Sequence, residues 1–338
     1  MKKDNLLVTV IIPVYNGERY IEACLYSVCN QTLREIEIIC VNDGSTDSSL
    51  SLLQKIAQTD KRIRILEQKN KGLSATRNLG LAAAEGEYVL FLDCDDTLVP
   101  DALENLYGTA SENRLDTLFF SARVVYETFG VKLTYYRKYN QYYRRTGSYP
   151  GVQGGPEMFR MLVENGDYRM SACLQLIRRQ FLIENEIDFR EGILHEDNLF
   201  TFRVILGAER VMVIPGQLYI RLLRKGSIMT GISRVRSSWG YFVCLREMIE
   251  QAGRGVYSPK VRTAVHHVIM LTQREAILPI CGMGKEEVIE CLLEKISPEE
   301  QLQYELLVLN GEWMQQQRKL RKRIIRVIKR RLEKEKVC

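Results

Sequence analysis

The chain has 338 residues, of which 46% are hydrophobic and 27% are charged. This length fits one large domain or two moderate ones, and the ordinary composition excludes a largely disordered chain and a collagen-like repeat. The sequence contains no uninterrupted run of 18 apolar residues, so we expect no transmembrane helix. The apolar run after Lys2 and Lys3 is short and lacks a cleavage site, which predicts a strand rather than a secretory signal.

The apolar and amphipathic segments of the first 125 residues alternate along the chain. Apolar, β-branched runs predict strands at Val8–Val14, Ile36–Val41, Ile63–Leu66, Tyr88–Leu92 and Thr117–Phe120. Amphipathic stretches predict helices near 17–31, 47–59, 73–84 and 100–113. Strands that are apolar on consecutive residues are buried on both faces, so the pattern predicts an α/β domain with a mostly parallel, doubly wound sheet. Ligands of such sheets bind at the carboxyl ends of the strands.

The remainder of the chain divides into three stretches. Residues 122–155 are rich in tyrosine and lack a clean helical period, which predicts β-hairpins and loops. Residues 156–223 return to a mixed α/β pattern, and from about 233 the pattern is helical, with breaks near 253–259, 279–284 and 297–298. We therefore expect three regions: an α/β domain over 1–230, a helical region over 231–317 and a tail over 318–338.

The tail carries most of the positive charge. Residues 318–336 contain eleven Lys and Arg against two Glu, a net +9, so the rest of the chain, whose total is +6, carries −3. Apolar residues recur there at every fourth position, namely Leu320, Ile324, Ile328 and Leu332. Such a helix is typical of a segment that lies on an anionic membrane surface. Docking onto the chain's own domain is the alternative, and the lack of aromatic residues within the basic run disfavours nucleic acid.

The nine cysteines are scattered and none forms a C-x-x-C pair, which disfavours a zinc or redox site. They predict small buried side chains in a reducing compartment, and therefore a cytoplasmic protein. The G-x-G-x-x-G, P-loop and G-x-S-x-G motifs are absent, which disfavours a nicotinamide or flavin site, a P-loop nucleotidase and a serine hydrolase.

Polar clusters follow several of the predicted strands, at 15–16, 42–47 and 93–96, and a fourth lies at 195–197. The cluster at 42–47 also fits a turn followed by a helix cap. Three carboxylates within four residues, Asp93, Asp95 and Asp96, repel one another, and a metal cation is the usual reason to assemble them, with a solvated turn as the alternative.

Five segments of the chain resemble the family 2 glycosyltransferases with the GT-A fold. They are VIIPVYNGERYIEACLYSV, VNDGSTDSS, NKGLSATRNLGL, YVLFLDCDD and HEDNLF, in the family's order, and the resemblance covers about residues 6–230. It implies a nucleotide-sugar donor, a divalent metal ion and inversion at the anomeric carbon. The Q-x-x-R-W signature of processive synthases is absent, which favours transfer of a single sugar.

The resemblance also assigns roles to residues on the donor side. Those implied to bind the nucleotide or its phosphates are Pro13, Tyr15, Asn16, Asp43, Lys71, Arg77 and Asp93. Asp43 would accept the N3–H of uracil, and Arg77 would hold donor phosphate or nucleotide. Asp93 would face the ribose and metal-bound water, and Asp95 would bind Mn²⁺ or Mg²⁺ directly. Asp96 is a third acid whose alternative role is a helix cap.

On the acceptor side, the resemblance makes Asp197 the general base that deprotonates the acceptor hydroxyl. Its alternative role is to complement the dipole of a helix predicted over 196–207. His195 and Glu196 would support the site or contact the acceptor, and the stretches 219–221 and 226–230 resemble the family's closing strand and loop.

The leading hypothesis is therefore a metal-dependent inverting glycosyltransferase at the inner face of a membrane. Its donor would be a nucleotide-sugar, most simply UDP-linked, and its acceptor a lipid-linked or surface-glycan precursor. A nucleotidyltransferase and a non-catalytic, membrane-associated glycan-binding protein that keeps the fold are the two alternatives.

Overall fold

The computed structural model describes residues 6–224, 233–281, 283, 299–300 and 302–307. Within this part, eight strands form one sheet in the order β3-β2-β1-β4-β7-β6-β8-β5. The strands are β1 (Val8–Val14), β2 (Ile36–Asp43), β3 (Ile63–Gln68), β4 (Tyr88–Phe91), β5 (Thr97–Leu98), β6 (Thr117–Tyr126), β7 (Gln175–Arg178) and β8 (Val211–Leu223). Strands β3, β2, β1 and β4 are mutually parallel, as are β6 and β8, whereas β7 and β5 run antiparallel to their neighbours.

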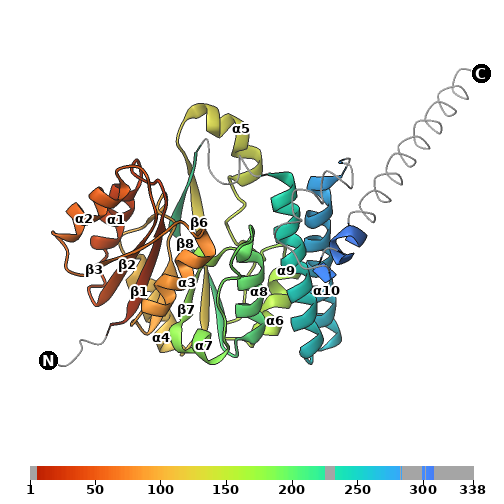
Figure 1. Cartoon of the computed structure of the whole chain (residues 1–338). Helices are drawn as coiled ribbons and strands as arrows, with labels where there is room; N and C mark the ends of the chain where they lie inside the picture. Colours follow the sequence, from red (N-terminus) through yellow and green to blue (C-terminus); the bar gives the residue numbers. More distant parts are fainter. Residues whose placement is uncertain (1–5, 225–232, 282, 284–298, 301, 308–338) are drawn as a thin grey trace, which may run out of the picture.

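Helices flank the sheet in Figure 1. In chain order they are α1 (Ile21–Cys29), α2 (Ser49–Ala57), α3 (Leu73–Ala83), α4 (Ala102–Glu112), α5 (Phe129–Tyr139), α6 (Gly155–Glu164), α7 (Arg179–Glu184), α8 (Glu196–Gly207), α9 (Arg234–Arg254) and α10 (Pro259–Ile277). Short 3-10 turns lie at Ala172–Leu174 and Leu278–Ile280. The predicted parallel α/β sheet is confirmed, and so are the five strands and four helices expected before residue 125. The central strands are rich in apolar residues, and β1 and β4 are buried along their whole length, whereas the edge strand β3 carries Arg64 and Glu67 and is partly exposed.

The prediction of β-hairpins and loops over 122–155 is wrong for its first half, whereas residues 140–154 form turns and loops as expected. Strand β6 continues to Tyr126, paired in parallel with β8, and helix α5 follows it. The Thr128 hydroxyl caps α5 by accepting the Val131 N–H at 3.3 Å, and Tyr135 and Tyr139 lie one turn apart with their rings 6.1 Å apart. Tyrosine favours strands by propensity alone, but the cap and the packing of the rings outweigh this preference.

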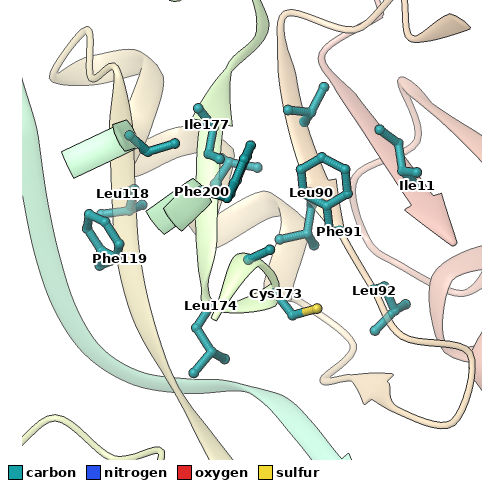
Figure 2. Close-up of a cluster of buried hydrophobic side chains, with 14 of the residues drawn as sticks. Ile11, Leu90, Phe91, Leu92, Leu118, Phe119, Cys173, Leu174, Ile177 and Phe200 are labelled. Atoms are coloured by element: carbon teal, nitrogen blue, oxygen red, sulfur yellow. The ribbon is translucent and has the colours of Figure 1, made fainter. Parts of the chain in front are cut away.

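A cluster of three aromatic rings connects strand β4 with helix α8. Figure 2 shows Phe91 on β4 facing Phe200 on α8, and their ring centroids are 5.8 Å apart at a near-perpendicular angle. Phe189 stacks on Phe200 at 3.9 Å and meets Phe91 edge-on at 5.0 Å. All three rings are buried. This packing holds the first turn of α8 beside the residues that follow β4.

The helices after residue 233 pack onto the same core. Cys244 and Met248 of α9 and Val261 and Val265 of α10 belong to the buried cluster that contains the sheet. The predicted helical region is therefore observed at α9 and α10, while the domain boundary near 230 stays a prediction. The tail at 318–338 lies outside the described residues. None of the helices in the described part is long and apolar enough to cross a bilayer.

Candidate active site

The loops after β1 and β2 are joined by hydrogen bonds. The Asn16 side-chain carbonyl accepts the Thr46 N–H at 2.8 Å, and the Asn16 N–H donates to the Ser45 hydroxyl at 3.1 Å. Asn16 has a positive φ of 50°, a conformation that asparagine tolerates. Tyr15 is 52% exposed beside it, whereas Pro13 is buried within β1. The loops after β1 and β2, about 30 residues apart in the sequence, thus lie side by side at the edge of the sheet. Tyr15 is exposed there and accessible to a ligand.

Asp43 ends β2 and is almost fully buried. Its carboxylate accepts the backbone N–H groups of Lys71 at 2.8 Å and Gly72 at 2.9 Å, and the Gln68 amide at 2.7 Å. Gly44 follows at φ 68°, and a Cβ there would lie 2.8 Å from the Asn70 nitrogen, so only glycine fits. Asp43 therefore fixes the loop between β3 and α3, on which the exposed Lys71 lies. The predicted hydrogen bond between Asp43 and the nucleobase of the donor stays a prediction.

The three acids after β4 have different surroundings. Asp93 accepts from Arg77 at 2.9 Å, and Asp95 accepts from Arg224 Nε at 2.7 Å. Asp96 is 2% exposed and accepts the Tyr219 hydroxyl at 2.6 Å and the Leu222 N–H at 2.7 Å. Asp96 therefore ties β8 to the β4 loop. It precedes strand β5 instead of starting a helix, so its alternative role as a helix cap is not observed.

Arg77 of α3 connects the end of β4 with the start of α8. Its Nη1 donates to Glu196 and to Asp197, both at 2.8 Å, while Nη2 donates to Asp93. Arg77 is 1% exposed, and its guanidinium lies over the Phe189 ring, 5.1 Å from the ring centroid. Three of the predicted site carboxylates thus converge on a fourth predicted residue. Among the partners that the structure gives Arg77, the charged ones are carboxylates, and its predicted contact with donor phosphate stays a prediction.

Burial and charge shift the pKa values of this cluster in opposite directions. Burial opposes ionisation of Asp93, but the nearby Arg77 and Arg221 guanidinium groups outweigh it and lower the pKa of that carboxyl. Burial, reinforced by the charge of Asp197, raises the pKa of Glu196 to about 7 despite its bond to Arg77. Burial raises the pKa of Asp96 to about 8. The cluster therefore combines one firmly ionised acid with two that ionise near neutrality.

The His195 side chain packs against α9. Its ring stacks on Tyr241 of α9 with the centroids 3.9 Å apart, and Nε2 lies 2.8 Å from the Ser237 hydroxyl. Its backbone carbonyl accepts the Asn198 N–H at 3.0 Å, so the residue forms the start of α8. Of the two roles predicted for His195, this geometry fits support of the site.

Sequence reasoning did not identify Arg224 or Tyr20 as site residues. The Arg224 guanidinium lies 4.8 Å above the centroid of the Tyr20 ring, and the Tyr20 hydroxyl donates to Glu127 at 2.8 Å. A contact network therefore leads from Asp95 to the residues just before α5. The sequence signal for Arg224 is weak: it is the first of two basic residues, Arg224 and Lys225, that precede the stretch 226–230, which lies outside the described residues.

The donor atoms after β4 fit a hard divalent cation. No group of three or more His, Cys, Asp or Glu side chains in the described ranges is placed to hold a metal ion. Asp93 and Asp95 nevertheless supply two carboxylates with side chains 23% and 19% exposed. Mg²⁺ and Mn²⁺ are commonly held by one or two carboxylates together with substrate phosphates and water, so a complete protein cage is not required.

Comparison with known proteins points to one family. The model for "Glycosyl transferase family 2" matches residues 9–165. Glycosyltransferase GlyG of Streptococcus pneumoniae is 30% identical over 266 residues, which cover 77% of this chain and 81% of GlyG. Glycosyltransferase GlyA of the same organism is 34% identical over 223 residues, 65% of this chain, but this chain spans only 31% of GlyA.

Solved structures show a similar architecture. S. aureus TarS residues 1–349, in complex with UDP-GlcNAc, aligns with a TM-score of 0.60 and 22% identity, covering 90% of this chain and 79% of that one. Mannosyltransferase PcManGT of Pyrobaculum calidifontis, in complex with GDP-Man and Mn²⁺, aligns with a TM-score of 0.55 and 17% identity, covering 91% and 86%. The sheet and its flanking helices are therefore of the GT-A type.

Proposed function

The chain belongs to glycosyl transferase family 2 and is a glycosyltransferase, and on this premise we propose its reaction. It transfers one hexosyl or N-acetylhexosaminyl unit, with inversion, from a UDP-sugar to a hydroxyl of a lipid-linked or surface-glycan acceptor. The observation that carries the proposal is the convergence of Asp93, Glu196 and Asp197 on Arg77. This contact brings the two acceptor-side acids, Glu196 and Asp197, next to the donor-side acid Asp93.

We assign Asp197 as the general base. Its Oδ1 accepts from Arg77, which fixes the carboxylate, and its side chain is 25% exposed, so it stays accessible to an acceptor hydroxyl. Asp197 removes the hydroxyl proton while that oxygen attacks the anomeric carbon from the face opposite the leaving diphosphate, which gives inversion. Glu196 is 6% exposed, and its raised pKa makes it a weaker choice for a base that must be ionised at neutral pH.

The donor side is assigned to the loops after β1, β2 and β3. Tyr15, Asn16 and Pro13 line the base pocket, Asp43 receives the base N3–H, and Lys71 and Arg77 act on the phosphate side. The exposure of Tyr15 and Lys71 at the rim supports their part of this assignment. TarS, which has a similar fold, was crystallised with UDP-GlcNAc, and this supports a UDP-sugar as donor.

We assign Mn²⁺ or Mg²⁺ to Asp95 and Asp93. When bound there, such a cation would neutralise charge on the leaving diphosphate. Arg224 pairs with Asp95, so its guanidinium lies beside the proposed cation site and could bind a phosphate oxygen of the donor there. PcManGT, a distant structural relative, was crystallised with Mn²⁺.

Two variants of this ion pair test the metal assignment. Asp95→Ala removes the direct ligand, so Mn²⁺-dependent UDP binding in titration calorimetry should be lost. Arg224→Gln removes the competing cation from the same carboxylate, so Mn²⁺ alone should bind more tightly in electron paramagnetic resonance titrations. Unchanged metal dependence in Asp95→Ala would show that Asp95 is not the ligand.

The reaction itself is tested by turnover with a panel of UDP-sugars and other nucleotide-sugars. We expect release of a nucleoside diphosphate from one UDP-sugar, accelerated by the acceptor. Release of pyrophosphate would instead identify a nucleotidyltransferase. Failure to bind UDP in the presence of Mn²⁺ would favour a non-catalytic glycan-binding protein.

We further propose that the protein works in the cytoplasm, peripherally on an anionic membrane. The sequence support is the basic, amphipathic pattern of residues 318–338, which lie outside the described part of the chain. No role for nucleic acid is proposed.

A further inference from the structure

Helix α5 presents large apolar side chains to solvent. Phe129 is 73% exposed, Leu133 69% and Tyr136 45%. Their spacing of four and then three residues places them on one face of the helix. Val131 and Tyr139, by contrast, are each only 7% exposed. Single exposed apolar residues are ordinary, but three together on one helix face indicate a surface that contacts something apolar.

The surroundings of this face are strongly basic. Between Thr128 and Pro156 the sequence contains five Lys and Arg and no acid. The exposed cations are Lys132, Arg137, Lys138 and Arg144. Glu275 of α10 interacts with Lys138 from the neighbouring helix, and Glu127, just before α5, is turned toward Tyr20. The α5 surface therefore attracts anions while offering apolar side chains.

Helix α5 lies at the same edge of the sheet as the active-site acids. Strand β6, which leads into α5, runs in the same direction as β1, β2 and β4, so it ends at the edge of the sheet where the site acids lie. Figure 1 shows α5 beyond the end of β6, projecting from the body of the molecule. Through Glu127, Tyr20 and Arg224, its base is connected to Asp95.

We propose that α5 is a membrane-contact helix that lies on an anionic lipid bilayer beside the active site. Phe129, Leu133 and Tyr136 insert at the boundary between the lipid headgroups and the acyl chains, and the surrounding cations bind the anionic headgroups, as is typical of interfacial amphipathic helices. Phe129 and Leu133, the two most exposed residues of the face, provide no hydrogen bonds to sugar hydroxyls, and a tyrosine such as Tyr136 is common at the membrane interface, so the face fits lipid better than glycan. The surface is independent of the basic tail and would direct the site toward an acceptor held in the membrane.

A tryptophan placed at the centre of the face tests this contact in the full-length protein. Leu133→Trp should be quenched by vesicles of phosphatidylglycerol and phosphatidylcholine whose acyl chains are brominated. The matched control is Ile183→Trp, because Ile183 is also exposed (53%) but lies on α7, at the opposite end of the molecule in Figure 1. Wild-type protein gives the background from Trp239 and Trp313. Quenching of Leu133→Trp no greater than that of the control would overturn the proposal.

A second measurement concerns affinity. Phe129→Glu/Leu133→Glu replaces two exposed apolar residues, so the fold should persist with an unchanged Tm, while binding to the same vesicles weakens by about tenfold or more. Ile183→Glu/Val256→Glu makes the same change of charge at residues 53% and 100% exposed and controls for general repulsion. Equal weakening in both pairs would contradict a specific contact. If the α5 pair instead loses binding to a lipid-free, soluble sugar-phosphate polymer and Leu133→Trp is not quenched, the surface is a glycan site and the proposal fails.

Discussion

Asp197→Asn is expected to lower the turnover number by about 10²–10⁴-fold, the usual contribution of a general base, while the affinity for the UDP-sugar is retained. The amide oxygen can still accept from Arg77, which reaches Oδ1 of Asp197 at 2.8 Å, so the local geometry should survive. The amide cannot accept the hydroxyl proton at neutral pH. Steady-state transfer rates and calorimetric UDP binding, measured on the same preparation, separate the two effects.

Glu196→Gln is the matched control for that variant. Glu196 lies one residue earlier and accepts from the same Arg77 nitrogen, but it is much less exposed. Our assignment therefore expects Glu196→Gln to retain most of the turnover. If Asp197→Asn remained nearly as active as wild type and Glu196→Gln lost activity, the roles of the two acids would have to be exchanged.

The fold was predictable where the pattern is local. The run from Val8 to Val14 and its counterparts at β2 and β4 are buried on both faces, so their composition alone indicates a covered parallel sheet. The same runs place Asp43 and Asp93 at one edge, because parallel strands end together. Helix α5 was not predictable in this way, because its capping by Thr128 and the packing of its tyrosine rings outweigh a composition typical of strands.

The site was predictable as a set of residues but not as a network. The sequence motifs identified Arg77, Asp93 and Asp197 separately, yet the contacts of Arg77 with Glu196 and Asp197 span 119 and 120 residues. Asp95 and Asp96 are adjacent in one motif, but one pairs with Arg224 and the other is buried against Tyr219. Such differences depend on how β8 lies beside the β4 loop, and a motif does not encode that.

Arg77→Met should destabilise the fold by about 3–5 kcal/mol, the range measured when one partner of a buried ion pair is removed. Methionine fills much of the space of the arginine side chain, but it leaves Asp93, Glu196 and Asp197 without the guanidinium that now compensates them. Urea denaturation in the presence of EDTA measures the free energy of unfolding without interference from metal ions.

The pH dependence of this loss separates the electrostatic effect from simple packing. In the wild type, the lowered pKa of Asp93 stabilises the fold at pH values above the ordinary carboxyl pKa, and this contribution is lost as the pH falls toward the lowered value. Without Arg77 the neighbouring acids should ionise only at higher pH, so the variant should lose stability as the pH rises from about 5 to 8. The difference in the free energy of unfolding between wild type and Arg77→Met should therefore be larger at pH 8 than at pH 5. Arg224→Met removes a more exposed guanidinium, whose carboxylate partner among the described residues is Asp95 alone, so its free energy of unfolding should differ less from that of wild type. If the loss of unfolding free energy in Arg77→Met did not depend on pH, Arg77 would stabilise the fold through packing rather than charge.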